Sequence, residues 1–393
     1  MATNISDFLS REVAAGYKPA IMRSKRILIA GAGALANNLA LILALSGCRW
    51  ILVVDFDDFE EHNRTRSPFF PSPTDVEKFK TWKKAFWVAF KAQALATATN
   101  PRFYYHTDFI QSCGDAAAEW ADVVFCCVDK NGARAYLAEL ARDHGKPFVE
   151  GGFFKESFSV MISRNSKESE ACWRCDFTGK LDGGISCTEY AKQVEKKGLI
   201  PATESVAAAA AGVQSELGIQ ALHGDFSFSG KRLFLNMRTG YSVVTVLASN
   251  PQCQGSHSIT RTRPMDLKTT SQDTVKNLLG EVSRHLPRPT LVLPAGFVFR
   301  APCRSCQKSC LYLAPGWKFK PAVCKTCGGV LKRADGPVMI YSEIHEKTSP
   351  EVLGLSCFTL GLSPRSRINA YSNMGKDRRF ALGGAAPFLK NHF

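Results

Sequence analysis

The stretch RILIAGAGALA, residues 26–36, decides the fold class of this chain. Its apolar first half is typical of a buried strand, and small and apolar residues then recur at helical spacing over residues 33–45. A second apolar run, WILVV at residues 50–54, ends at Asp55. Strand, glycine turn, helix and strand in this order predict a βαβ unit, in which the two strands lie parallel in one sheet.

Strand-type and helix-type segments continue to alternate beyond this unit. We expect a helix over residues 74–98, a strand at 103–106, a strand at 123–127, a helix over 132–143 and a strand at 147–150. Alternation of this kind predicts an α/β fold, a Rossmann-like domain whose mostly parallel sheet is covered by helices on both faces.

The second half of the chain differs in organisation from the first. A long helix rich in small residues is expected over residues 203–222, and a polar, irregular stretch follows at 256–266. A boundary in that stretch divides the chain into three predicted regions. These are an α/β domain at 1–258, a linker with a short helix at 259–290, and a small C-terminal module containing a zinc ribbon at 291–393.

Composition and charge exclude several classes of protein. The chain has 393 residues and a formal net charge of +15, so an acidic partner is expected. The basic residues are dispersed, which disfavours nucleic acid as that partner. The N-terminus lacks the pattern of a secretory signal, and the apolar runs are far shorter than the roughly 18 residues of a membrane span. We therefore expect a cytoplasmic protein, in which paired cysteines are metal ligands or reactive thiols.

The glycine turn predicts a nucleotide site. Gly31 and Gly33 belong to a GxGxxA element between strand and helix, where glycines let a phosphate approach backbone N–H groups at the helix N-terminus. Asp55 follows Gly33 by 22 residues, at the end of the next strand, where a carboxylate accepts hydrogen bonds from ribose hydroxyls. The alternative is a glycine turn that serves only the close packing of helix on strand.

The residues after this strand carry a resemblance to a known family. The stretch from Asp55 to Arg66 resembles the DxDxVxxxNxxRQ segment of the ThiF/MoeB/HesA superfamily, which includes ubiquitin-activating enzymes. Asp57, Asn63 and Arg66 stand at the matching positions. The resemblance implies that the nucleotide is ATP, because fixed positive charge after the ribose-binding acid suits a triphosphate.

A second match completes the implied ATP site. The segment CVDKNGAR at residues 127–134 is similar to the CxDNxxxR strand end of the family, which implies that Asp129 holds Mg²⁺. DVEKFK at residues 75–80 resembles the family's DVGxPK segment, so Lys80 is assigned to the phosphates, with Lys84 as the alternative. Arg11 is assigned as the N-terminal arginine that reaches the nucleotide of a partner protomer, which implies a homodimer.

The family resemblance also implies a structural zinc site in the α/β domain. Cys172 and Cys175, in CWRC, resemble the first half of that site in the family. At the place of the second half this chain has Cys253 and His257, which gives a Cys₃His set suited to Zn²⁺. The alternative for a single CxxC pair is a redox-active dithiol.

A second zinc site is predicted from spacing alone. Two CxxC pairs in the C-terminal module are separated by 17 residues, which is typical of a zinc ribbon. Cys310 is a possible substitute ligand. The ligands of this site are Cys303, Cys306, Cys324 and Cys327.

Cys187 is the predicted nucleophile. It has no CxxC partner and follows two glycines, Gly183 and Gly184. In the family, a cysteine at this place forms a thioester with the C-terminus of a carrier protein. The alternative is a small buried thiol, which is the usual environment of a free cysteine.

Taken together, the resemblance implies an enzyme that adenylates the C-terminal carboxylate of a small ubiquitin-like (β-grasp) protein with ATP. A thioester on Cys187 and transfer to a conjugating enzyme would follow. Three alternatives stay open. They are a sulfur-carrier adenylyltransferase of the thiamin or molybdopterin type, a nicotinamide-dependent oxidoreductase, against which Arg66 and Asp129 argue, and a zinc-ribbon nucleic-acid-binding protein.

Overall fold

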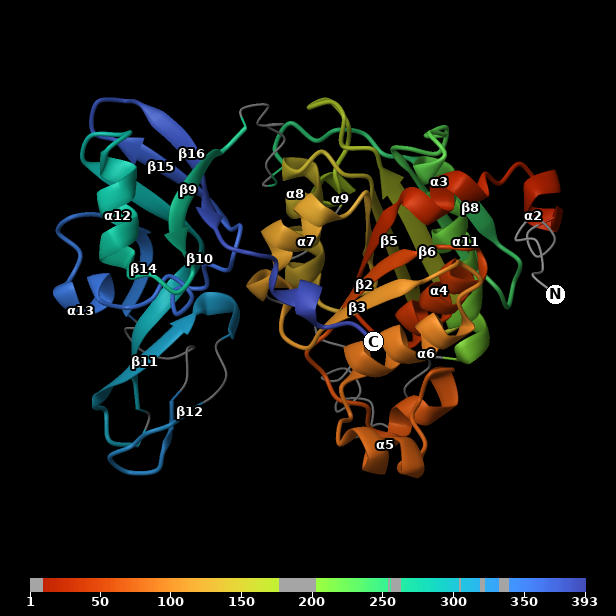
Figure 1. The fold of residues 1–393 in the computed structure, drawn as a ribbon, viewed down its shortest axis with the longest axis horizontal. Coiled ribbons are helices and arrows are strands. Elements are labelled where there is room, and N and C mark those ends of the chain that lie inside the picture. Colours follow the sequence, from red (N-terminus) through yellow and green to blue (C-terminus); the bar gives the residue numbers. More distant parts are fainter. Residues whose placement is uncertain are drawn as a thin grey trace. The chain divides into compact units, whose positions relative to one another are not determined.

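The structure is a computed structural model in which contacts divide the chain into two compact units (Figure 1). It describes residues 10–176, 203–253, 255, 263–303, 305–318, 322–331 and 339–393. Unit 1 comprises residues up to Ile110, Ala117–Thr260 and Phe388–Phe393, and unit 2 comprises Gln111–Ala116 and Arg261–Pro387. The chain therefore leaves unit 1, forms unit 2, and returns to unit 1 with its last six residues.

In the described residues, unit 1 is built on an eight-stranded sheet of order β3-β2-β1-β4-β5-β6-β7-β8. The first five strands of that order pair in parallel, and the last three are added antiparallel. Their bounds are β1 Arg26–Ala30, β2 Trp50–Val54, β3 Arg102–His106, β4 Val123–Cys126, β5 Phe148–Phe154, β6 Ser157–Ser163, β7 Lys231–Asn236 and β8 Ser242–Val246. This arrangement confirms the predicted α/β class with a mostly parallel sheet.

Helices cover both faces of this sheet (Figure 1). α4 (Ala34–Leu45), α6 (Lys84–Leu95) and α11 (Glu204–Leu222) lie on one face, and α8 (Asn131–Asp143) lies on the other. The apolar residues of α4, α6 and α11 join those of the central strands in one buried cluster that includes Leu39 and Trp87. The small residues of α11 let it pack closely, since a Cβ on its Gly218 would lie 2.1 Å from the Phe125 ring.

One predicted helix was wrong in its extent. Residues 74–98 form two helices, α5 (Pro73–Phe79) and α6, separated by Lys80 in the left-handed region at φ 54°. The break is held by backbone pairing, because Phe59 N–H donates to Trp82 O (2.8 Å) and Lys84 N–H donates to Asp57 O (3.0 Å). Lysine carries no sequence signal for this conformation, which glycine or asparagine adopts more readily.

Unit 2 contains a six-stranded sheet and its own core. Its path is β11-β10-β15-β16-β9, with β14 paired to β10. The bounds are β9 Met265–Thr270, β10 Pro289–Pro302, β11 Ser309–Pro315, β14 Met339–Ile344, β15 Arg367–Ser372 and β16 Asp377–Gly383. α12 (Val275–Ser283) buries Leu278 and Val282 in a cluster with Phe297 and Phe380. Residues 265–283, within the predicted linker region, are thus part of this core.

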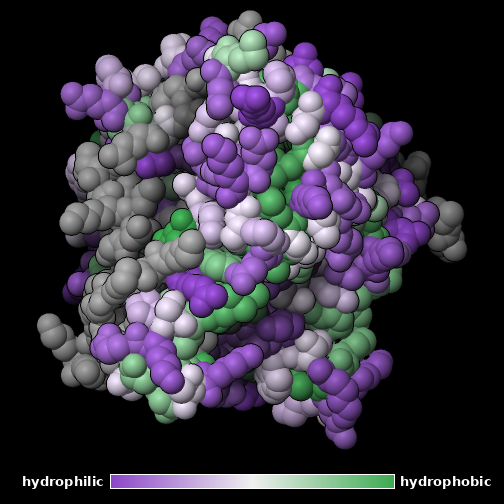
Figure 2. Space-filling view, turned by 90° about the vertical axis from the view of Figure 1, so that its left-hand side faces the viewer, coloured by the Kyte–Doolittle hydropathy of each residue, from purple (hydrophilic) through white to green (hydrophobic). Residues whose placement is uncertain are grey.

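One face of the molecule is mainly polar. Figure 2 shows hydrophilic side chains over most of one face, with hydrophobic side chains between them. Single exposed apolar residues are ordinary in folded proteins. Among the described residues, no helix is both long and apolar enough to cross a membrane.

Candidate nucleotide site and cysteine clusters

The glycine turn between β1 and α4 uses its two glycines differently. Gly31 has φ +98°, and a Cβ there would lie 2.6 Å from the carbonyl oxygen of Cys127. Glycine is therefore required at 31 by the backbone itself. Gly33 is the residue before the first turn of α4, and a Cβ there would meet nothing within 4 Å. The space in front of the helix N-terminus is open, as a phosphate-binding turn requires.

The glycine turn lies at the point where the strand order of the sheet reverses. β1 is flanked by β2 on one side and β4 on the other, so the loops after β1 and β4 lead to helices on opposite faces. Ligands of open α/β sheets bind at such a switch point, at the carboxyl ends of the strands. Asp129 lies three residues beyond the end of β4 and is exposed.

Asp55 is half-buried, and both of its carboxylate oxygens already accept backbone hydrogen bonds. Its Oδ2 accepts a hydrogen bond from Ala32 N–H (2.6 Å), and its Oδ1 accepts one from Asp57 N–H (2.7 Å). Burial raises the pKa of Asp55 to about 6, and the nearby Lys84 ammonium opposes that rise. Asp55 therefore holds the glycine turn in shape, while Asp57 keeps 48% of its side chain exposed.

The structure brings Lys84, rather than Lys80, to the carboxylate of Asp57. Lys84 is the first residue of α6, only 14% of its side chain is exposed, and its Nζ lies 3.5 Å from Asp57 Oδ2. Lys80 is exposed and lines a shallow surface pocket with Asp58 and Trp82.

Asn63 and Arg66 lie on one short 3₁₀ helix, Glu61–Arg66. Asn63 is 8% exposed, and its Oδ1 accepts a hydrogen bond from Glu60 N–H (2.9 Å), which fixes the first turn. Arg66 is the last residue of this helix and is half-buried. Rigid placement of the helix thus determines where the guanidinium of Arg66 can reach.

Asn37, which sequence reasoning missed, ties this segment to the glycine turn. It is fully buried in α4, and its Nδ2 donates to Ala32 O (3.0 Å) and Gly33 O (2.9 Å). Its Oδ1 accepts from Phe69 N–H (3.1 Å), three residues beyond Arg66. The sequence signal that could have identified Asn37 is an amide side chain within an otherwise apolar helix.

Gln214 of α11 is a second missed residue, and it ties the end of β4 to the neighbouring strand β5. It is fully buried, and its Nε2 donates to Cys126 O (3.1 Å) and Val149 O (3.0 Å). Cys126 is the last residue of β4, and Val149 is the second residue of β5. Gln214 therefore fixes the strand end from which Asp129 extends.

Arg134, in the second sequence match, has an internal partner. It forms an ion pair with the buried carboxylate of Glu150 and donates to Gly151 O (3.2 Å). Arg232 lies 4.0 Å from the other Glu150 oxygen and 3.1 Å from Asp176. The charges of two arginines and two carboxylates thus balance each other beside β5.

Three of the four predicted ligands of the first zinc site lie together. The Cys172 sulfur is 3.8 Å from that of Cys175 and 3.7 Å from that of Cys253, and the three lie within 4.8 Å of one another. Sulfurs bound to one Zn²⁺ at about 2.3 Å are separated by about 3.8 Å in a tetrahedron. His257 and Cys187 lie outside the described residues. Arg11 is exposed on α2 (Ser10–Ala14).

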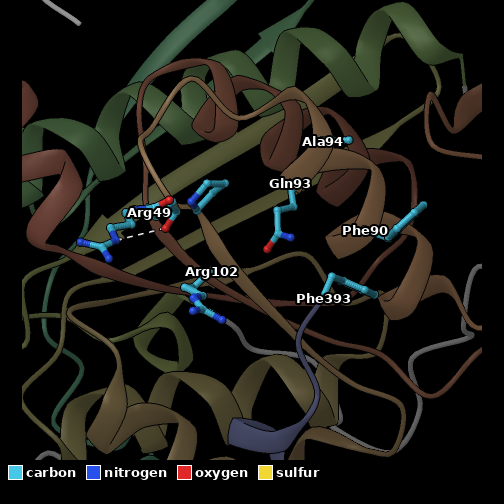
Figure 3. Close-up of a pocket in the computed structure, with 8 residues that line it drawn as sticks. Arg49, Phe90, Gln93, Ala94, Arg102 and Phe393 are labelled. Atoms are coloured by element: carbon cyan, nitrogen blue, oxygen red, sulfur yellow. Dashed lines mark hydrogen bonds between the residues drawn. The ribbon is translucent and has the colours of Figure 1, made fainter.

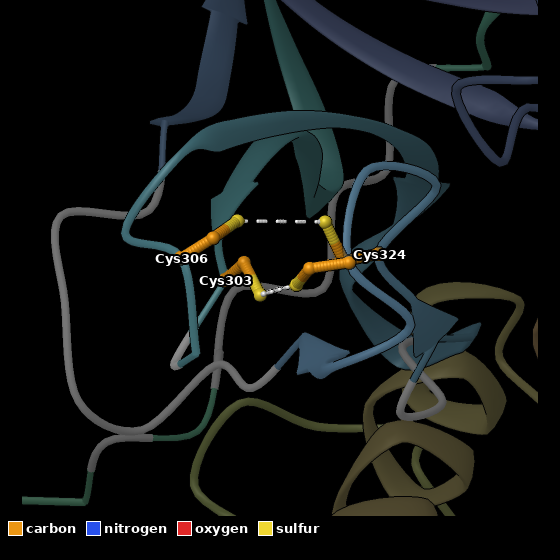
Figure 4. A group of neighbouring side chains, drawn as sticks. Cys303, Cys306 and Cys324 are labelled. Carbon is orange, nitrogen blue, oxygen red and sulfur yellow. Dashed lines mark hydrogen bonds between the residues drawn. The ribbon is translucent and has the colours of Figure 1, made fainter.

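The second cluster brings all four predicted ribbon cysteines together (Figure 4). The sulfurs of Cys303 and Cys327 are 3.4 Å apart, and those of Cys306 and Cys324 are 3.8 Å apart. Backbone N–H groups of the following residues lower the pKa of Cys324 to about 6, which favours the thiolate that a metal binds. Cys310 lies beside the set, with its sulfur 3.4 Å from that of Cys324. The donor set suits Zn²⁺.

Sequence comparison finds a family and individual proteins to which this chain is similar. A model described as the ThiF family matches residues 14–255. The chain is 24% identical over 243 residues to ubiquitin-like modifier-activating enzyme 5 from Dictyostelium discoideum, covering 61% of this chain and 63% of that protein. It is 27% identical over 182 residues to adenylyltransferase and sulfurtransferase uba4 from Aspergillus niger, covering 42% of this chain and 36% of that protein. The chain thus spans less than two thirds of either relative's length.

Solved structures share the fold. The crystal structure of E. coli MccB with MccA-N7isoASN superposes with a TM-score of 0.52 at 16% identity, covering 65% of this chain and 76% of that one. The structure of E. coli MccB with ATP gives a TM-score of 0.50 at 17% identity, covering 65% and 75%. At such identity the likeness concerns the fold alone.

Proposed function

The chain belongs to the ThiF family, and from this premise we propose that it is an adenylyltransferase that activates the C-terminal carboxylate of a small ubiquitin-like protein with ATP. One observation carries the proposal. The glycine turn, Asp57 with Lys84, and the helix of Asn63 and Arg66 all follow β1 or β2 at the switch point of the sheet, tied together by buried amides.

In this proposal each group has a role in binding ATP. The N–H groups at the start of α4 and the side chains of Arg66 and Asn63 bind phosphate oxygens. Lys84 replaces Lys80 as our choice for the phosphate-binding lysine, because it is the one held beside Asp57. Asp57 accepts the ribose hydroxyls, since both oxygens of Asp55 already accept backbone hydrogen bonds.

Asp129 is proposed to hold Mg²⁺. Its carboxylate is exposed at the strand end that Gln214 fixes, and carboxylate oxygen is the ligand that Mg²⁺ prefers. When bound, Mg²⁺ would neutralise charge on the phosphates.

Adenylation is then a displacement at the α-phosphorus of ATP. A carboxylate oxygen of the carrier protein forms a bond to that phosphorus, the bond to the oxygen bridging the β-phosphate breaks, and pyrophosphate leaves with the electron pair. The protein contributes position and positive charge rather than covalent chemistry. Arg66 neutralises charge that develops on the phosphates in the transition state.

A thioester on Cys187 is proposed as the second step. The thiolate sulfur attacks the carboxyl carbon of the acyl-adenylate, and AMP leaves; a conjugating enzyme then accepts the carrier. The relative named as a ubiquitin-like modifier-activating enzyme supports this route. The relative named as an adenylyltransferase and sulfurtransferase supports the alternative, in which a sulfur donor intercepts the adenylate.

Two structural Zn²⁺ ions and a homodimer complete the proposal. The two cysteine clusters would each hold one ion, with His257 as fourth ligand of the first. The edge strand β8 supports a protein partner on unit 1, because Val244 and Val246 are 50% and 73% exposed. An exposed edge strand presents backbone N–H and C=O groups with which a strand of another chain can pair. A mass of two chains in sedimentation equilibrium is the expected result.

Carrier-dependent exchange of radiolabelled pyrophosphate into ATP tests the proposed function. We expect exchange with a β-grasp protein that ends in glycine and none with the same protein lacking its last residue, because the carboxylate is then misplaced. Absence of exchange with every such carrier encoded near this gene would overturn the proposal.

The second step has its own test. Wild-type protein with ATP and carrier should form an adduct that a thiol reductant cleaves, and Cys187→Ala should lose the adduct while keeping pyrophosphate exchange. Robust exchange without any adduct would favour the sulfur-carrier alternative.

A further inference from the structure

A pocket of about 640 Å³ lies in unit 1 at the end of the sheet opposite the glycine turn (Figure 3). Arg102 begins β3 and Arg49 precedes β2, so the pocket opens at the amino ends of these strands. The proposed adenylation chemistry lies at the carboxyl ends. The volume of the pocket falls in the range of about 300–1,000 Å³ that small-molecule sites occupy.

The pocket carries two guanidinium groups and, among the side chains of its described lining residues, no carboxylate. The lining residues are Arg49, Phe90, Gln93, Ala94, Asn100, Pro101, Arg102 and Phe393. Elsewhere in the described structure arginines commonly face carboxylates, as Arg174 does with Glu139 at 2.6 Å. A concave surface lined by two guanidinium groups attracts anions.

Arg49 is fixed in orientation before any ligand binds. Its Nε donates to Asn100 O (3.2 Å), and its guanidinium lies over the Trp50 ring at 4.9 Å. The two Nη groups of Arg49 are further donors that a ligand can use. A guanidinium held in this way offers the planar fork that suits phosphate or carboxylate.

The other side of the pocket is apolar. Phe90 and Phe393 form it, with ring centroids 5.1 Å apart, and Figure 3 shows them across from the two arginines. Gln93 lies between, and because its Oε1 accepts from Phe103 N–H (2.7 Å), its amide N–H₂ remains as a neutral donor.

Phe393 belongs to the segment by which the chain returns to unit 1. Its ring packs on Phe86 (5.2 Å) and Tyr105 (5.3 Å), and Tyr105 N–H donates to Asn391 O (3.2 Å). One wall of the pocket is therefore present only while this segment is docked on β3 and α6.

We propose that this pocket is an effector site for a small phosphate monoester with an aromatic or apolar body. Phosphate binds Arg49 and Arg102, and the body packs on Phe90 and Phe393. A phosphate monoester carries close to two negative charges at pH 7, which matches two guanidiniums better than the single charge of a carboxylate. Binding stabilises the docked segment, because Phe393 is part of the site.

Calorimetric titration of the full chain with phenyl phosphate tests this site. Phenyl phosphate should bind more tightly than inorganic phosphate or benzoate, each of which lacks one half of the recognised chemistry. Arg102→Gln should weaken phenyl phosphate about tenfold or more, as loss of a charge-assisted hydrogen bond implies. Phe393→Ala should weaken phenyl phosphate and leave inorganic phosphate unchanged.

Two control variants locate the binding. Arg378→Gln removes an exposed arginine of β16 in unit 2 and should change nothing. Arg66→Gln alters the proposed ATP site and should leave phenyl phosphate binding intact, so the result does not depend on whether adenylation is the function. Binding that is lost in Arg66→Gln and kept in Arg102→Gln would overturn the proposal, and so would the absence of saturable binding at millimolar probe.

Discussion

The proposed nucleotide site and the second cysteine cluster, the proposed zinc ribbon, obtain their geometry by different physical means. The nucleotide site gathers residues far apart in sequence, from Gly31 to Gln214, and fixes them through a large apolar core and buried amides. The ribbon gathers nearby residues, and its buried cluster consists of Cys303 and Cys324 with the partly buried Cys306, Cys310 and Tyr312. The fold alone can order the first site, whereas in our proposal a metal orders the second.

Loss of the ribbon metal should give the largest effect. In Cys324→Ser we expect one Zn²⁺ equivalent fewer and local unfolding around β12 (Ala322–Val323) and β13 (Val330–Leu331), because structural zinc contributes about 10–16 kcal/mol in small metal-dependent domains. Pyrophosphate exchange should persist, since the nucleotide site has its own core. Elemental analysis and hydrogen exchange by mass spectrometry measure the two effects.

Cys310→Ser is the matched control, because its sulfur lies 3.4 Å from that of Cys324 without belonging to a CxxC pair. It should retain the metal. Loss of zinc in Cys310→Ser together with retention in Cys327→Ser would show that Cys310 is the fourth ligand.

Arg66→Gln should lower carrier-dependent exchange by about 10²–10³-fold, the cost of one lost transition-state charge contact. Arg64→Gln is its control on the same short helix, because Arg64 is exposed and pairs with Glu61 at 3.0 Å. Exchange kinetics at saturating ATP measure both. Equal losses in the two variants would mean that general basicity of this helix, rather than the position of Arg66, matters.

Gly31→Ala and Gly33→Ala should separate folding from binding within the glycine turn. At Gly31 the methyl group would meet the Cys127 carbonyl at 2.6 Å in a left-handed backbone, so we expect a loss of about 3 kcal/mol in unfolding free energy. At Gly33 the methyl group enters open space, so stability should be kept while ATP affinity falls. Urea denaturation and ATP titration test the pair. A stable Gly31→Ala protein would show that the turn is less constrained by the core than we argue.

The features of the two sites that can be predicted from sequence are local ones. The βαβ pattern and the CxxC pairs are read from residues a few positions apart, and both were confirmed as a mostly parallel sheet and as clustered sulfurs. The two-helix break at Lys80 was not foreseen, because lysine gives no signal for a left-handed residue. Gln214 and the return of Phe393 to unit 1 act over long sequence distances, where pattern reasoning has no information.

The smallest predicted effect concerns the half-buried carboxylate of Asp55, which holds the glycine turn. Burial raises the pKa of Asp55 to about 6 in the folded protein, above its unfolded value of about 3.9. The folded state therefore binds more protons than the unfolded state between these pH values, and Asp55 becomes less unfavourable to folding as the pH falls from 6 toward 4. Its ionised form costs the fold a constant amount above pH 6.

The difference in unfolding free energy between wild type and Asp55→Asn isolates this group, because other titrations occur in both proteins and cancel. That difference should shift in favour of wild type by about 2 kcal/mol as the pH falls from 7 to 4, given 1.36 kcal/mol per pKa unit. Urea denaturation at a series of pH values measures it. A flat difference would mean that the hydrogen bonds from Ala32 and Asp57 fully offset the burial of Asp55. In that case the core would fix the turn without an electrostatic cost, and the contrast with the proposed metal-ordered ribbon would be sharper still.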